Sequence, residues 1–214
     1  MELQKALSQI STIHAQVLRS EVFRGYRAVT MAATGGICLL AASMQATFMP
    51  AQDHVGFVLF WLLVASVCAG ICATDLIMST RHLAGRGLRQ NTLMVVSQTL
   101  PALAVGAALT GILVYQSREQ AVLLPGLWAL VYSLGVFAAR PYLPRAIGWV
   151  GAYYLAAGGY LLWIAEPSAV PSPWGMGMTF GFGQLGLAVV FYLNIERYED
   201  TAEQRAEEAR EEGR

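Results

Sequence analysis

Six long apolar runs occupy most of the sequence, and they leave few folds open to it. Each run holds about 20 residues, the length that an α-helix needs to cross roughly 30 Å of hydrocarbon. Within all six runs the only residue with a formal charge is Asp75. A backbone inside lipid must satisfy its own hydrogen bonds, so the runs predict α-helices. They cover Ala28–Phe48, Val55–Met78, Leu93–Tyr115, Ala121–Ala139, Ala146–Ala165 and Trp174–Ile195.

The composition points to the same environment. Hydrophobic residues make up 56% of the chain and charged residues only 13%, whereas soluble domains carry about 25% charged residues. The connections between the runs are too short to hold a soluble domain. We therefore expect an all-α membrane protein, a compact bundle of six transmembrane helices over residues 28–195, with a cytoplasmic segment 1–27 before it and a tail 196–214 after it.

The two end segments differ in character. Residues 1–27 carry apolar side chains such as Leu3, Leu7 and Ile10 along one stripe, which predicts an amphipathic helix. Such a helix can lie on the membrane surface, pack on the protein's own loops or bind a cytoplasmic protein partner. The tail from Glu196 to Arg214 holds eight acidic residues and four arginines, a net charge of −4. It predicts a charged helical extension, which is either a solvated end or a docking segment for a basic partner.

Lysine and arginine alternate between the loops in a way that predicts orientation. Cytoplasmic loops of membrane proteins are enriched in these residues. The loops 48–55 and 166–173 contain neither, and the loop 116–120 contains Arg118 alone. The other side carries Arg19, Arg24, Arg27, Arg81, Arg86, Arg89, Arg140, Arg145 and Arg197. Both termini are therefore expected in the cytoplasm, with the chain in a bacterial inner membrane.

Asp75 is the first candidate for a functional residue, because ionisable groups in a membrane span are costly and often functional. Ser79 and His82 follow it at i+4 and i+7, so the three residues share one helix face. A proton or anion path can use an aspartate and a histidine in this arrangement. Asp75 also lies about one turn from the predicted membrane boundary, where it can serve as an ion-pair anchor to Arg81 or Arg86.

Three glutamines, Gln45, Gln98 and Gln184, lie within or near the spans. Their amides can hydrogen-bond across helices and hold them together. They can equally line a path for a polar uncharged solute, since an amide both donates and accepts. Together with Asp75, Ser79 and His82 they form the candidate polar path.

The stretch "GFGQLG", Gly181 to Gly186, matches the G-x-G-x-x-G pattern of dinucleotide-binding loops. That loop must follow a strand and open a helix, whereas this stretch lies in the middle of an apolar run. Gly177 and Gly181 share one helical face with Ala188, and small residues four apart let membrane helices approach closely. The glycines are therefore expected to serve helix packing. Pro101 and Pro125 lie inside two runs and are expected to kink them.

The sequence predicts no enzyme, because it holds no catalytic triad, zinc-protease or phosphate-loop pattern. Its three cysteines and three histidines lack the spacing of a metal site, so neither metal nor cofactor is expected, and nucleic acid is excluded as a partner. Two functions stay open. One is a small channel or permease for a small uncharged or protonatable solute. The other is a noncatalytic membrane scaffold or signalling partner that acts through residues 1–27 and the acidic tail, as a homo-oligomer or with a cytoplasmic protein.

Overall fold

The computed structural model describes residues 27–49, 53–82, 86–166 and 169–196. The predicted amphipathic helix before Arg27 and the charged tail after Glu196 lie outside these residues. The described part of the chain is all-helical and contains no strand. The main elements are α2 (Ala28–Phe48), α3 (His54–His82), α4 (Arg86–Gln116), η1 (Arg118–Leu123), α5 (Leu124–Ala139), η2 (Arg140–Tyr142), α6 (Ile147–Trp163), α7 (Pro173–Phe191) and η3 (Tyr192–Glu196).

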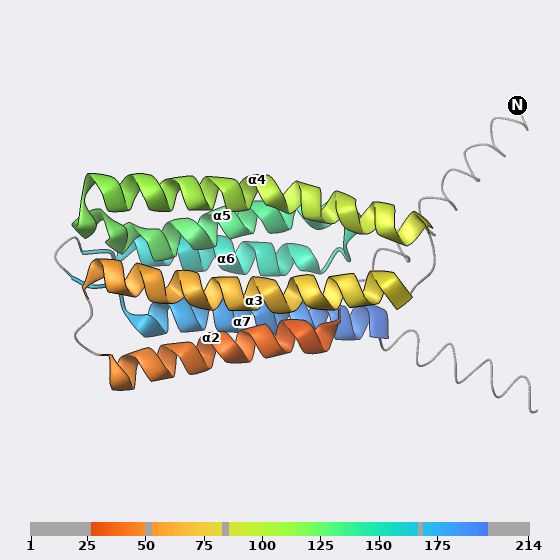
Figure 1. Ribbon diagram of the computed structural model, residues 1–214, viewed down its shortest axis with the longest axis horizontal. Coiled ribbons are helices and arrows are strands. Elements are labelled where there is room, and N and C mark those ends of the chain that lie inside the picture. Colours follow the sequence, from red (N-terminus) through yellow and green to blue (C-terminus); the bar gives the residue numbers. More distant parts are fainter. Residues whose placement is uncertain (1–26, 50–52, 83–85, 167–168, 197–214) are drawn as a thin grey trace, which may run out of the picture.

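The six α-helices run side by side in alternating directions (Figure 1). We call the end of the bundle that holds Ala28 and Glu196 the proximal end. The opposite end, which holds Phe48, Gln116 and Trp163, is called the distal end. The first and last helices of the described chain therefore begin and finish at the same end.

Five helical stretches are long and apolar enough to cross a membrane, which confirms five of the six predicted runs as helices of that kind. The sixth helix, α6, has 17 residues, which corresponds to about 26 Å at 1.5 Å per residue. It lies alongside the others in the bundle (Figure 1). The five stretches are Ala28–Phe48, His54–Met78, Ser97–Gln116, Arg118–Ala139 and Pro173–Asn194.

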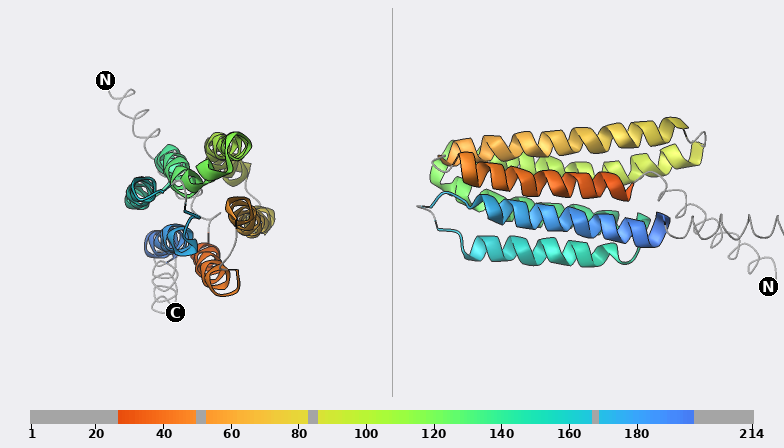
Figure 2. Two further views of the ribbon diagram at one scale, coloured as in Figure 1. Left: turned by 90° about the vertical axis from the view of Figure 1, so that its left-hand side faces the viewer. Right: turned by 90° about the horizontal axis from the view of Figure 1, so that it is seen from below.

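Seen from its end, the bundle is a ring of helices with one weak junction (Figure 2). The most extensive contacts join α2 to α7 and α5 to α6, and α6 also packs on α7 while α4 packs on α5. Helix α3 packs on α2 and on η1, but it touches α4 very little. The ring is therefore least closed between α3 and α4.

Two pairs of glycines set the two closest helix crossings. A Cβ atom on Gly35 of α2 would lie 2.9 Å from the carbonyl oxygen of Gly181 in α7, and one on Gly181 would lie 3.3 Å from the carbonyl oxygen of Gly35. The same reciprocity holds between Gly126 of α5 and Gly158 of α6, at 2.9 Å in both directions. At these points the backbones touch, which is how membrane helices associate without a hydrophobic driving force.

The "GFGQLG" stretch lies wholly inside α7. Gly181 faces α2, as does Gly177, whose Cβ would overlap Ala42. A Cβ on Gly183 would overlap the Tyr154 ring of α6, and one on Gly186 would lie 3.6 Å from Val150 of the same helix. Each glycine of the pattern therefore faces a neighbouring helix.

The two prolines occupy different places in their helices. Pro101 lies inside α4, as expected. Pro125 lies in the first turn of α5, directly after the 3-10 helix η1, so the expected kink in the interior of this helix is wrong. A proline suits the first turn of a helix because its missing N–H has no partner there in any case. It starts α5 rather than bending it.

Candidate functional site

Aromatic rings from three helices pack together inside the bundle. The ring of Tyr132 (α5) lies 4.7 Å from that of Tyr154 (α6) and 6.0 Å from that of Phe180 (α7), centre to centre. Tyr154 and Phe180 are 5.6 Å apart, and Tyr154 is completely buried. These three residues, here called the aromatic plug, occupy the space between α5, α6 and α7.

Gln184 of α7 reaches this plug. Its side-chain nitrogen donates a hydrogen bond of 2.9 Å to the hydroxyl oxygen of Tyr132. Two other polar atoms nearby, the Tyr154 hydroxyl and the Gln184 Oε1, are buried with no hydrogen-bond partner among the described residues. The hydroxyl can donate and the amide oxygen can accept, so a small neutral molecule that does both would match them.

Gln45 makes a separate contact near the distal end. The Trp61 indole N–H of α3 donates to its Oε1 at 2.8 Å, and both side chains are almost completely buried. The bond joins α2 to α3 inside an apolar cluster that includes Phe57 and Met176. Gln45 therefore serves helix association.

Asp75 makes its described contact at the other end of the same helix pair. The Thr30 hydroxyl of α2 donates to Asp75 Oδ2 at 2.7 Å, and Asp75 is partly buried. The side chains of the expected arginine partners, Arg81 and Arg86, lie outside the described part of the structure, as do those of Ser79 and His82. Only Asp75 of the predicted polar stripe can thus be placed by its side chain.

The four candidate path residues whose side chains the structure describes are not brought to one point. Gln45 and Thr30, the α2 partner of Asp75, are 15 positions apart, which is about 22 Å along a helix. Gln184 lies at the aromatic plug, and Gln98 is exposed on α4. The described polar side chains therefore form separate contacts rather than one lined path.

The cysteines lie at the contact between α2 and α3. Cys38 is buried, and the Cys68 thiol lies 4.0 Å from the carbonyl oxygen of Thr34. Cys38, Cys68 and Cys72 are free thiols. Within the residues that the structure describes, no group of three or more Cys, His, Asp or Glu side chains is placed to hold a metal ion.

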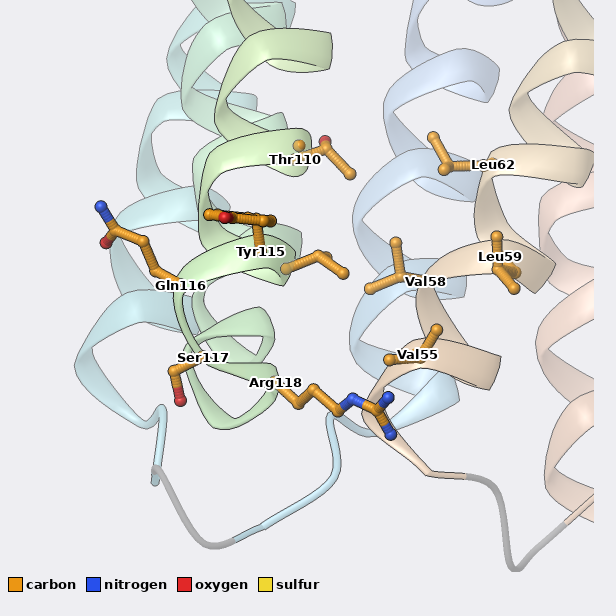
Figure 3. A pocket seen from close by; sticks show the side chains of 11 residues that line it. Val55, Val58, Leu59, Leu62, Thr110, Tyr115, Gln116, Ser117 and Arg118 are labelled. Carbon is orange, nitrogen blue, oxygen red and sulfur yellow. The ribbon is translucent and has the colours of Figure 1, made fainter.

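A groove that the sequence reasoning missed opens at the distal end, where α3 and α4 separate (Figure 3). Its volume is about 650 Å³. Apolar side chains of both helices line it, and Arg118 extends from the start of η1 toward Val55 at the start of α3. The sequence signal was Arg118, the one basic residue in the three predicted outer loops.

No protein-family model, curated protein or solved structure matches this chain.

Proposed function

We propose that this chain is a noncatalytic membrane scaffold with a closed helical interior. The observation that carries the proposal is that polar side chains within the predicted spans form hydrogen bonds between helices. Gln45, Asp75 and Gln184 each hydrogen-bond to a side chain of a neighbouring helix. Polar side chains engaged in this way hold a bundle together, and those in the described part of the chain form separate contacts rather than a row along its length.

Under this proposal the protein crosses a bacterial inner membrane six times, and both of its termini lie in the cytoplasm. Two features support it: the alternation of arginines between the loops, and the common end that Ala28 and Glu196 share. The scaffold would contact its partners through residues 1–27 and the acidic tail. Reporter fusions at residue 214 and in the 166–173 loop should report opposite sides of the membrane, and the same side for both would refute this topology.

Solute permeability separates the scaffold from a channel. Proteoliposomes that contain the protein should take up urea and glycerol at the same rate as protein-free liposomes, measured by stopped-flow light scattering. Protein-dependent uptake of either solute would overturn the proposal.

A permease for a small neutral solute is the second candidate, and the unpartnered atoms at the aromatic plug favour it. The Tyr154 hydroxyl and Gln184 Oε1 offer one donor and one acceptor deep in the bundle. Under this alternative, uptake would depend on the protein and would be lost in Gln184→Leu. The matched variant Gln98→Leu removes an exposed amide from α4 and should leave such uptake unchanged.

A further inference from the structure

The groove between α3 and α4 joins an apolar trough to a cation. Its walls carry Val58, Leu59 and Leu62 from α3, and Gly111 and Val114 from α4. Arg118 lies at its distal mouth and points across toward α3 (Figure 3). A ligand that fits this arrangement has a long apolar part and an anionic head.

The length of the groove covers more than half of one leaflet of a bilayer. Its lining on α4 runs from Thr110 to Gln116, six positions that correspond to about 9 Å of helix. The hydrocarbon core of a bilayer is about 30 Å thick, so one leaflet is roughly 15 Å. The apolar trough therefore spans more than half of a leaflet and can hold that part of an acyl chain when Arg118 is level with the headgroups.

The charge of Arg118 is available to a ligand. Arg118 is exposed and makes no ion pair with a residue that the structure describes. Asp53 directly precedes α3, and its Oδ1 accepts a 2.8 Å hydrogen bond from the Gly56 N–H. This carboxylate therefore caps the N-terminus of α3. A guanidinium pairs well with phosphate because its N–H groups match two phosphate oxygens at once.

The position of Arg118 in the topology adds an independent argument. The predicted outer loops otherwise lack lysine and arginine, so this residue departs from the charge pattern that sets orientation. A basic residue kept at this one place, at the mouth of an apolar groove, is accounted for by an anionic headgroup.

We propose that this groove binds one anionic phospholipid of the distal leaflet. One acyl chain lies between α3 and α4, and the phosphate is held by Arg118. The site fills the weak junction in the helix ring, so the lipid completes the contact between α3 and α4. The proposal does not depend on whether the protein is a scaffold or a permease.

Native mass spectrometry of the full chain in detergent, titrated with dioleoyl phosphatidylglycerol or dioleoyl phosphatidylcholine, tests the headgroup contact. The wild type should retain one phosphatidylglycerol and bind phosphatidylcholine more weakly. Arg118→Gln should weaken phosphatidylglycerol binding about tenfold, the loss of one charge-assisted contact. Arg145→Gln removes an exposed arginine at the proximal end and should bind as the wild type does. Equal losses in both variants would show charge attraction alone and would overturn the proposal.

Filling the groove tests the acyl-chain contact. A Cβ on Gly111 meets nothing within 4 Å, so Gly111→Phe should enter the groove without disturbing the core and should abolish retention of both lipids. Gly159 of α6 is equally open, and Gly159→Phe should retain phosphatidylglycerol. If the melting temperature of Gly111→Phe without lipid is lower than that of Gly159→Phe, Leu59→Trp is used in its place, because it narrows the groove from the α3 wall. A groove-filling variant that folds stably and still retains lipid as well as the wild type would refute the site. A wild-type dimer mass in place of the lipid adduct would also refute it.

Discussion

Asp75 and Thr30 show how one polar side chain in a span can be structural. The Thr30 hydroxyl donates to the carboxylate at 2.7 Å and joins α2 to α3, the two helices that the Trp61–Gln45 hydrogen bond also joins nearer the distal end. The expected ion-pair partners of Asp75, Arg81 and Arg86, have side chains outside the described part of the structure, so that pairing stays a prediction. The described partner of Asp75 is the Thr30 hydroxyl, 45 positions away on α2. The spacing of residues along α3 alone does not predict that partner.

Substitutions at this pair should separate an anchor from a proton site. Thr30→Val removes the donor and should cost about 1 kcal/mol of stability, the usual scale for a hydrogen bond between membrane helices. Asp75→Asn keeps a carbonyl acceptor and should cost less. Thr74→Val is the matched control, because the Thr74 hydroxyl bonds to the Gly70 carbonyl of its own helix. Thermal unfolding in detergent measures all three, and a larger loss in Asp75→Asn than in Thr30→Val would contradict the hydroxyl anchor.

The glutamines illustrate a general limit of residue-scale prediction. That an amide in a span bonds across helices follows from the cost of leaving it unpaired, and the sequence left this role and a solute path open for Gln45, Gln98 and Gln184. Which residue it meets depends on helix rotation and on distant elements: Gln184 bonds to Tyr132, 52 positions away. No periodicity within one helix contains that information.

At the scale of elements, the close helix crossings depend on single glycines next to glycines that are not needed. Gly35 and Gly158 each face a backbone carbonyl of the opposite helix at 2.9 Å, whereas their neighbours Gly36 and Gly159 meet nothing within 4 Å. The helix contacts therefore require glycine at Gly35 and Gly158, whereas the adjacent Gly36 and Gly159 are free to change.

Alanine substitutions at these four adjacent glycines provide matched tests. Gly35→Ala and Gly158→Ala should push the helices apart and destabilise the protein by about 1–3 kcal/mol, as overpacking does. Gly36→Ala and Gly159→Ala should be neutral or stabilising by up to about 1 kcal/mol, because alanine favours the helix. The four melting temperatures in detergent give the comparison. Equal losses at adjacent positions would mean that the crossings lie elsewhere.

Element boundaries were largely readable from apolar run lengths. The run Ala28–Phe48 coincides with α2, and the other runs differ from their helices mainly at the ends. The largest differences are at α3 and α4, which continue into the polar connection between them. There the helix persists through mostly polar residues, because helical hydrogen bonding does not depend on lipid. Pro125 was misplaced for a related reason: the sequence does not reveal that a 3-10 turn precedes it.

At the scale of the whole molecule, the described helices form an incomplete ring, and aromatic side chains of α5, α6 and α7 pack together within it. Tyr154 is completely buried beside Gly183, and the tight α2–α7 and α5–α6 crossings flank it. The number of helices and their class followed from composition and run length, whereas the order of helices around the ring did not. That order depends on which faces carry glycine opposite a bulky neighbour, and several orders satisfy the same sequence pattern.

Cys38 tests the proposed closed interior most directly, because the residue is only 7% exposed and belongs to the apolar cluster of α2, α3 and α7. The protein carrying Cys68→Ala and Cys72→Ala, placed in lipid nanodiscs, should leave Cys38 unmodified by a charged, water-soluble maleimide. The reagent should react fully after denaturation in SDS. A cysteine introduced at exposed Glu119, in a chain without other cysteines, sets the rate of free access. Modification of Cys38 in the folded protein at a rate close to that control would show water in the interior and would contradict a closed bundle.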